Sequence, residues 1–273
     1  MKILQLFYQV WFSMAMLAGL VMNWLACVTV SALVRDSRTA QKWCYYINHY
    51  LFRYLLLKAC PWIRVSPPPE EDIKRLMGKG KVCLLMNHTS FFDTVLFVGT
   101  IPASVIWRYK ALMKSGMFEV PLLGGICGMI GHFPVYFTST DQNTFTVDKP
   151  KQAKVTEEMK AYVDAKGCFC IFPEGKISRN PAELCPFRKG IFNIIEEKGM
   201  SVVSLTSRGN YEAWPVGAAV GGLPAEISMK LTEVAKEGHG MSSDEIREKA
   251  AKMMQADVDF LLKERDGPKS KES

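Results

Sequence analysis

The 273-residue chain lacks several patterns that would assign it to a familiar class of protein. It has no GxSxG sequence, so the nucleophile elbow of a lipid hydrolase is missing. Eight cysteines are present without a single CxxC pair, which disfavours a zinc site and favours buried free thiols in a reducing compartment. No internal repeat or P-loop glycine spacing occurs, and the basic residues are not interleaved with aromatics as in nucleic-acid-binding modules.

Charge is also missing from residues 3–34, a run of 32 positions, whereas a spanning helix needs about 20. The run is too long for a signal-peptide core. We therefore expect a membrane helix, either as one tilted span or as half of a hairpin with residues 43–62. In that second stretch large side chains recur at helical spacing, which suits packing or a membrane interface. These are Trp43, Tyr46, Ile47, Tyr50, Leu51, Tyr54 and Leu55.

Three prolines, Pro67 to Pro69, mark the expected start of a second region. Beyond them, apolar strand-like runs alternate with helical stretches, which predicts an α/β fold with a mixed sheet flanked by helices. The expected strands are 82–86, 103–107, 133–137, 168–172, 201–206 and 226–231. The predicted organisation is a membrane-associated helical segment (1–66), a catalytic domain (67–265) and a disordered tail (266–273).

His88 and Asp93 follow the first of these strands and lie five residues apart. Five steps of a regular helix, at about 100° each, would put them about 140° apart, so they meet only across a turn. Ser90 suits the N-cap of a helix over 91–98, which leaves His88 in the turn and Asp93 in the first helical turn. Asp93 would then orient the imidazole as in a Ser-His-Asp triad without its nucleophile, an arrangement that fits a substrate hydroxyl as nucleophile. In the alternative, Asp93 belongs to a capping box and only receives backbone N–H groups.

A second polar turn follows the strand expected at 168–172. It contains Pro173, Glu174 and Gly175, and the cations Lys176 and Arg179 come directly after. An acidic residue and cations at the carboxyl end of a strand suit a phosphate-bearing ligand. The alternative is an ordinary solvated turn.

Together the two motifs resemble the NHxxxxD and FPEG blocks of the glycerolipid acyltransferase family, whose best-known members are the 1-acylglycerol-3-phosphate acyltransferases. The resemblance covers residues 80–210 and includes a Phe-Lys-x-Gly-like segment at 187–190. Three features depart from the family pattern. Phe137 stands where an arginine usually ends the second block, Lys176 and Ile177 replace the threonine and arginine of FPEGTRS, and serines replace prolines in 201–205.

The resemblance implies that His88 and Asp93 are catalytic and that the acceptor is bound by Asn87, Glu174, Gly175, Lys176, Arg179 and Lys189. It implies an acyl-CoA-dependent transfer to the free hydroxyl of a lysophospholipid, first of all 1-acylglycerol-3-phosphate to give phosphatidic acid in phospholipid biosynthesis. Other acceptors, namely lysophosphatidylcholine, lysophosphatidylethanolamine or glycerol 3-phosphate, and a non-catalytic lipid-binding relative remain alternatives. No metal or organic cofactor is implied, and acyl-CoA is a co-substrate.

The charge pattern indicates the surroundings of the protein. A net charge of +7 suits anionic membrane lipids and CoA, and no nucleic acid or obligate protein partner is indicated. Arg35, Arg38 and Lys42 follow the apolar run, which predicts that the downstream region faces the cytosol. The terminal residues 269–273 resemble a dilysine retrieval signal of the endoplasmic reticulum. Asn87-His88-Thr89 is formally an N-glycosylation sequon, but a glycan there would cover the expected base.

Overall fold

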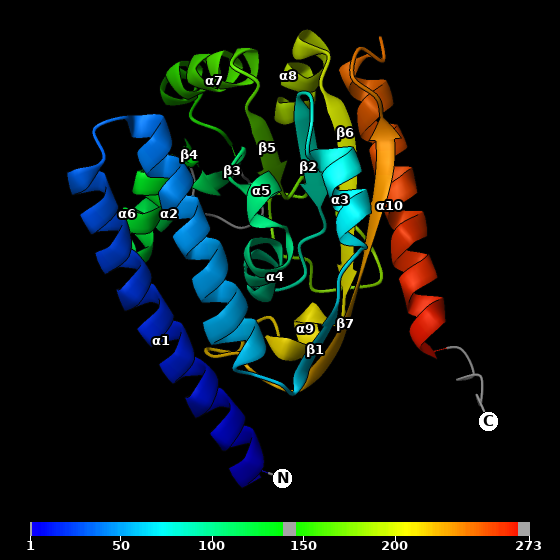
Figure 1. The fold of residues 1–273 in the computed structure, drawn as a ribbon. Coiled ribbons are helices and arrows are strands. Elements are labelled where there is room, and N and C mark those ends of the chain that lie inside the picture. The colour runs from blue at the N-terminus through cyan, green and yellow to red at the C-terminus, as the bar shows by residue number, and fades with distance from the viewer. Residues whose placement is uncertain (1, 139–145, 267–273) are drawn as a thin grey trace.

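The computed structural model describes residues 2–138 and 146–266 and is centred on a seven-stranded sheet (Figure 1). The strand order is β1-β7-β6-β2-β5-β3-β4. All neighbouring strands are parallel except β6 and β7, so the predicted mixed sheet flanked by helices is confirmed. The strands are β1 Ile63–Ser66, β2 Val82–Met86, β3 Tyr109–Lys114, β4 Phe133–Val135, β5 Cys168–Ile171, β6 Ser201–Arg208 and β7 Ala225–Ala235. The helices are α1 Lys2–Leu33, α2 Ser37–Leu51, η1 Phe52–Lys58, α3 Glu70–Met77, α4 Phe92–Thr100, α5 Ala103–Ile106, η2 Ser115–Glu119, α6 Leu123–Ile130, α7 Lys149–Asp164, α8 Gly190–Lys198, α9 Asn210–Ala213 and α10 Ser243–Asp266.

Helices cover both faces of the sheet. Successive side chains of a strand point to opposite faces, so each strand contributes to two separate clusters. In β2, Leu84 packs into a cluster with α1 to α6, whereas Cys83 and Leu85 pack into a second cluster with α7, α8 and α10. Figure 1 shows these two groups of helices on either side of the central strands. The central strand is therefore buried on both faces, as its uninterrupted apolar sequence predicts.

The predicted strand at 103–107 is wrong. Residues Ala103–Ile106 form α5, which starts on Pro102, and the backbone N–H groups of Val105 and Ile106 both bond to the Pro102 carbonyl. Proline with its fixed φ favours a helix start, so a short apolar run was not enough to define a strand. The strand β1 was not expected; it lies just before Pro67 and pairs with β7. The predicted division at Pro67 thus falls after the first strand of the sheet. The part of the predicted tail beyond Asp266 lies outside the described residues.

The long apolar run forms α1, which packs beside α2 after a three-residue connection (Figure 1). Asn23 Nδ2 donates to Asn48 Oδ1 across this hairpin at 2.6 Å, within a buried contact. α1 therefore packs against the second predicted stretch, as in the helical hairpin. By length and composition α1 is able to cross a membrane, and most of its apolar residues are exposed.

The aromatic stripe of residues 43–55 lies on the outer face of α2 and η1. Trp43, Tyr50 and Tyr54 are about half exposed, whereas the opposite face of α2, including Cys44 and Tyr45, is buried. The other members of the stripe, Tyr46, Ile47, Leu51 and Leu55, are half-buried, so the stripe combines packing with exposed rings. Its exposed rings beside α1 fit the membrane-interface interpretation.

The eight cysteines are all free thiols, and seven of them are buried. Cys168 and Cys170 share the face of β5 that joins the cluster with α1 to α6. They act as small apolar core residues.

Candidate active site

The two sequence motifs meet at the carboxyl ends of three parallel strands. Asn87 and His88 follow β2, Phe172 and Glu174 follow β5, and Ser207 is near the end of β6. Because β2 pairs with β5 on one side and β6 on the other, all three segments converge at one edge of the sheet. This edge is where ligands bind in open α/β sheets.

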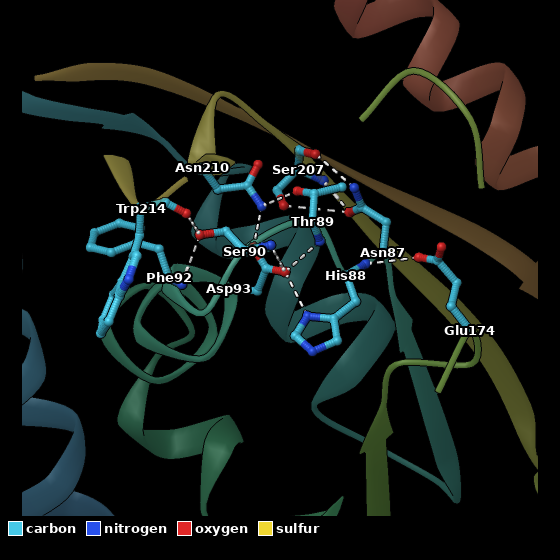
Figure 2. Close-up of polar contacts among 10 residues, drawn as sticks. All are labelled: Asn87, His88, Thr89, Ser90, Phe92, Asp93, Glu174, Ser207, Asn210 and Trp214. Atoms are coloured by element: carbon cyan, nitrogen blue, oxygen red, sulfur yellow. Dashed lines mark hydrogen bonds and ion pairs between the residues drawn. The ribbon is translucent and has the colours of Figure 1, made fainter. Parts of the chain in front are cut away.

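His88 and Asp93 form the centre of the site (Figure 2). His88 Nδ1 lies 2.9 Å from Asp93 Oδ2, with His88 in the strand-to-helix turn and Asp93 in the first turn of α4. The Asp93 side chain is 3% exposed and that of His88 is 18% exposed. No group among the described residues forms a hydrogen bond to Nε2 of His88. The Asp93 contact holds the proton on Nδ1 and leaves Nε2 as the basic nitrogen.

The capping interpretation of Asp93 also holds. Its Oδ2 atom accepts the backbone N–H of Thr89 at 2.8 Å and that of Ser90 at 3.0 Å. Ser90 Oγ in turn accepts the N–H of Phe92, the first residue of α4, at 3.0 Å, and the N-cap position itself falls on Phe91 instead of the predicted Ser90. The Asp93 carboxylate thus both closes the turn and orients the imidazole. The capping contacts and the contact with His88 occur together in the same structure.

The turn after β5 surrounds His88. The ring of Phe172 stacks on the imidazole, with centroids 4.0 Å apart and planes at 15°. Glu174 Oε1 accepts the backbone N–H of His88 at 2.9 Å, and the Ser178 N–H donates to the His88 carbonyl at 2.6 Å. Three residues of the second motif therefore fix the ring plane and the backbone of the histidine in the first.

Glu174 does not have the position expected for contact with a substrate. The residue is 1% exposed, and its second oxygen, Oε2, accepts the N–H of Cys185 at 2.7 Å. Burial raises the pKa of its carboxyl above the ordinary value, against the lowering effect of the two backbone N–H donors. Both oxygens are occupied, so the geometry gives Glu174 a positioning function instead.

Asn87 is also buried, with 2% of its surface exposed. Its Nδ2 donates to the carbonyl of Ser207 at 2.9 Å, and its Oδ1 accepts the Ser207 N–H at 2.8 Å. This reciprocal pair ties the start of the first motif to β6, contrary to the expected substrate contact. It also encloses the amide nitrogen to which a glycan would be attached.

The cations of the second motif divide into two groups. Lys189 is ion-paired with Asp244 of α10 at 2.6 Å. Lys176 and Arg179 are exposed and form no ion pair among the described residues. In the sequence they lie on either side of Ser178, whose N–H donates to the His88 carbonyl. Gly175 stands between them and Glu174 with φ of 69°, where a side chain would be strained.

Two contributors missed by the sequence analysis come from α9 and the residue after it. Asn210 Nδ2 bonds to Thr89 Oγ1 at 2.8 Å and to Asp93 Oδ1, and the Trp214 carbonyl accepts the hydroxyl of Ser90 at 2.7 Å (Figure 2). The available signal for Asn210 was the polar Ser-Arg-Gly-Asn run at 207–210, which begins in the last two residues of β6 and continues beyond the strand.

The fold and the site define an acyltransferase-type α/β protein, and comparison with known proteins agrees. The family described as Acyltransferase matches residues 68–208, just over half of the chain. The chain belongs to this family.

Among curated proteins, the chain is 28% identical over 173 residues to a chloroplastic 1-acyl-sn-glycerol-3-phosphate acyltransferase of Brassica napus. It is 26% identical over 174 residues to one of Arabidopsis thaliana. These matches cover 61% and 62% of this chain but only 45% and 43% of the relatives, so the chain matches less than half of their length. The crystal structure of the 1-acyl-sn-glycerophosphate acyltransferase PlsC of Thermotoga maritima superposes with a TM-score of 0.74 at 18% identity, covering 96% of this chain and 97% of that one. That likeness shows that the fold is shared.

Proposed function

We propose that the protein transfers a fatty acyl group from acyl-CoA to the free hydroxyl of a lysophospholipid, with 1-acylglycerol-3-phosphate as the acceptor and phosphatidic acid as the product. The observation that carries the proposal is the His88 imidazole, oriented by Asp93 at Nδ1 and open at Nε2. No serine, threonine or cysteine of the described residues hydrogen-bonds to that nitrogen, so the reacting hydroxyl belongs to the substrate. The curated relatives are named 1-acyl-sn-glycerol-3-phosphate acyltransferases, which supports the proposed acceptor.

The proposed reaction is a direct transfer. Nε2 of His88 takes the proton of the acceptor hydroxyl as its oxygen attacks the thioester carbonyl carbon. The carbon–sulfur bond then breaks, and the imidazolium returns the proton to the departing CoA thiolate, giving the ester and CoA. Asp93 keeps the ring in the productive tautomer throughout. Such base assistance contributes about 10²- to 10⁴-fold in rate.

Lys176 and Arg179 are the cations proposed to hold the acceptor phosphate, since both are exposed on the turn that hydrogen-bonds to the backbone of His88. The positions of two family arginines are occupied by Phe137 and Ile177. That smaller number of cations favours, as a second candidate, a zwitterionic acceptor such as lysophosphatidylcholine or lysophosphatidylethanolamine. Both candidates use the same base.

The same proposal places the enzyme on a membrane, because α1 and the aromatic stripe expose apolar surface. Its assignment to the cytosolic face of the endoplasmic reticulum rests on Arg35, Arg38 and Lys42 and on the terminal dilysine-like sequence, which lies outside the described residues. Protease added to sealed microsomes is expected to digest the catalytic region, and endoglycosidase to cause no mobility shift. Protection together with glycosylation of Asn87 would reverse this topology.

The test of function is an assay of the full-length chain, purified in detergent, against a panel of lysolipids and acyl-CoAs. CoA release and product mass are measured together. We expect phosphatidic acid from 1-acylglycerol-3-phosphate, and a loss of about 10² or more in kcat for His88→Ala with unchanged thermal unfolding. Transfer to a zwitterionic acceptor alone would favour the second candidate. Equal turnover by a folded His88→Ala variant would remove the mechanism.

A further inference from the structure

Asn210 reaches Asp93 from α9, more than a hundred residues further along the chain (Figure 2). The residue is fully buried, and its Nδ2 donates to Asp93 Oδ1 and to Thr89 Oγ1. Its position is set by Gly209, whose φ is 90° and where a Cβ would lie 2.1 Å from the carbonyl oxygen of Glu226. Only glycine fits that turn, so the backbone leads Asn210 directly back to the first motif.

The two oxygens of Asp93 are held in different ways. Oδ2 accepts three donors, from His88, Thr89 and Ser90. Oδ1 has one donor among the described residues, the amide of Asn210. Rotation of a carboxylate about its last torsion is soft, so the donor on the far oxygen, together with the three donors on Oδ2, fixes the plane in which Oδ2 faces the imidazole.

Asn210 also carries an energetic cost that is not expected of a residue with only a structural role. Its own oxygen, Oδ1, is buried and has no hydrogen-bond partner among the described residues. A buried unpaired acceptor requires an explanation, and here the two N–H bonds to Asp93 and Thr89 provide it.

We propose that Asn210 is a positioning residue for the transfer reaction, which fixes the Asp93 carboxylate and through it the tautomer and orientation of His88. Asn210, Asp93 and His88 form one chain of hydrogen bonds that ends at Nε2, the proposed base. This inference rests on the proposed function. It adds a member to the site that neither motif contains.

A double-mutant cycle tests the proposal. Asn210→Leu is expected to lower kcat about tenfold or more while both KM values stay within about twofold, because only the alignment of the base is lost. In an Asp93→Asn background the same substitution is expected to have little further effect, since its target is already altered. Asn48→Leu, which removes a buried amide in α2 away from the site, is the matched control and should retain kcat. If Asn210→Leu does not fold, Asn210→Ala takes its place.

A spectroscopic measurement separates positioning from packing. The chain has four histidines, so ¹⁵N-histidine NMR in micelles can resolve the His88 nitrogens. We expect the Nδ1–H tautomer in the wild type and a mixture of tautomers in Asn210→Leu. Unchanged kcat, or effects of Asn210→Leu and Asp93→Asn that multiply, would overturn the proposal. An inactive wild type would instead reject the proposed function.

Discussion

Glu174 Oε1 and the backbone N–H of His88 are joined by a hydrogen bond of 2.9 Å, although the residues lie 86 positions apart. This bond connects the two motifs of the site. Because the Ser178 N–H also bonds to the His88 carbonyl, the histidine backbone is held on both its donor and its acceptor side. The acidic residue of the second motif therefore acts through the histidine of the first.

We predict that Glu174→Ala lowers stability and kcat together. The substitution leaves the N–H groups of His88 and Cys185 without their acceptor, at about 1–3 kcal/mol for each buried group. Urea unfolding and steady-state kinetics on the same preparation check this. A raised KM for the lysolipid with unchanged unfolding would instead restore the substrate contact expected from sequence.

The exposed cations give a prediction with an internal control. Arg179→Gln should raise the KM for 1-acylglycerol-3-phosphate more than that for acyl-CoA, because a contact to the acceptor phosphate is lost from the ground state. Lys189→Gln should leave the acceptor KM unchanged, since Lys189 is already paired with Asp244. The reverse ranking of the two variants would place the phosphate beside α10.

His132 predicts a dependence of stability on pH. Burial, reinforced by Lys110, lowers the pKa of its imidazole to about 3, and Nδ1 accepts the Ala111 N–H at 3.1 Å. Between pH 6.5 and about 3 the unfolded chain therefore binds a proton that the folded chain does not. Stability should fall on acidification through this window, by up to about 1.4 kcal/mol per pH unit from this residue. His132→Gln should flatten that part of the curve, measured by urea unfolding at several pH values; a parallel curve would contradict the assignment.

Phe12 connects α1 to the site. Its ring lies 5.6 Å from that of Trp214, edge to face, and 6.1 Å from that of Phe92, which precedes Asp93. Phe12→Ala should destabilise the fold by about 3–5 kcal/mol, as expected for an emptied aromatic site, and lower kcat.

Phe7→Ala is the matched control for that prediction. Phe7 is 51% exposed on the same helix, and its removal should change the unfolding free energy by less than about 0.5 kcal/mol. Thermal unfolding in detergent compares the two variants. Equal shifts of the unfolding transition in the two variants would mean that the contacts of Phe12 with Trp214 and Phe92 do not hold α1 in place.

The features that sequence predicted well are those set by neighbouring residues. The strand, the turn and the first helical turn from Val82 to Asp93 follow from a local apolar run and a local cap, so the His88–Asp93 pair could be expected. Short segments without a strong local signal were missed, as β1 was, or were assigned wrongly, as at Ala103–Ile106.

The sequence by itself determined the α/β class, the apolar helix and the pairing of His88 with Asp93, because periodicity and spacing within a segment decide them. Only the tertiary structure decided what the other polar side chains do. Asn87 and Glu174 looked like ligand groups, yet each finds backbone partners on a distant segment, and Lys189 finds Asp244. Asn210 belongs to neither motif, yet its side chain donates a hydrogen bond to Asp93. Most buried polar groups are paired, and the partner is whichever group the packing of remote strands brings within reach.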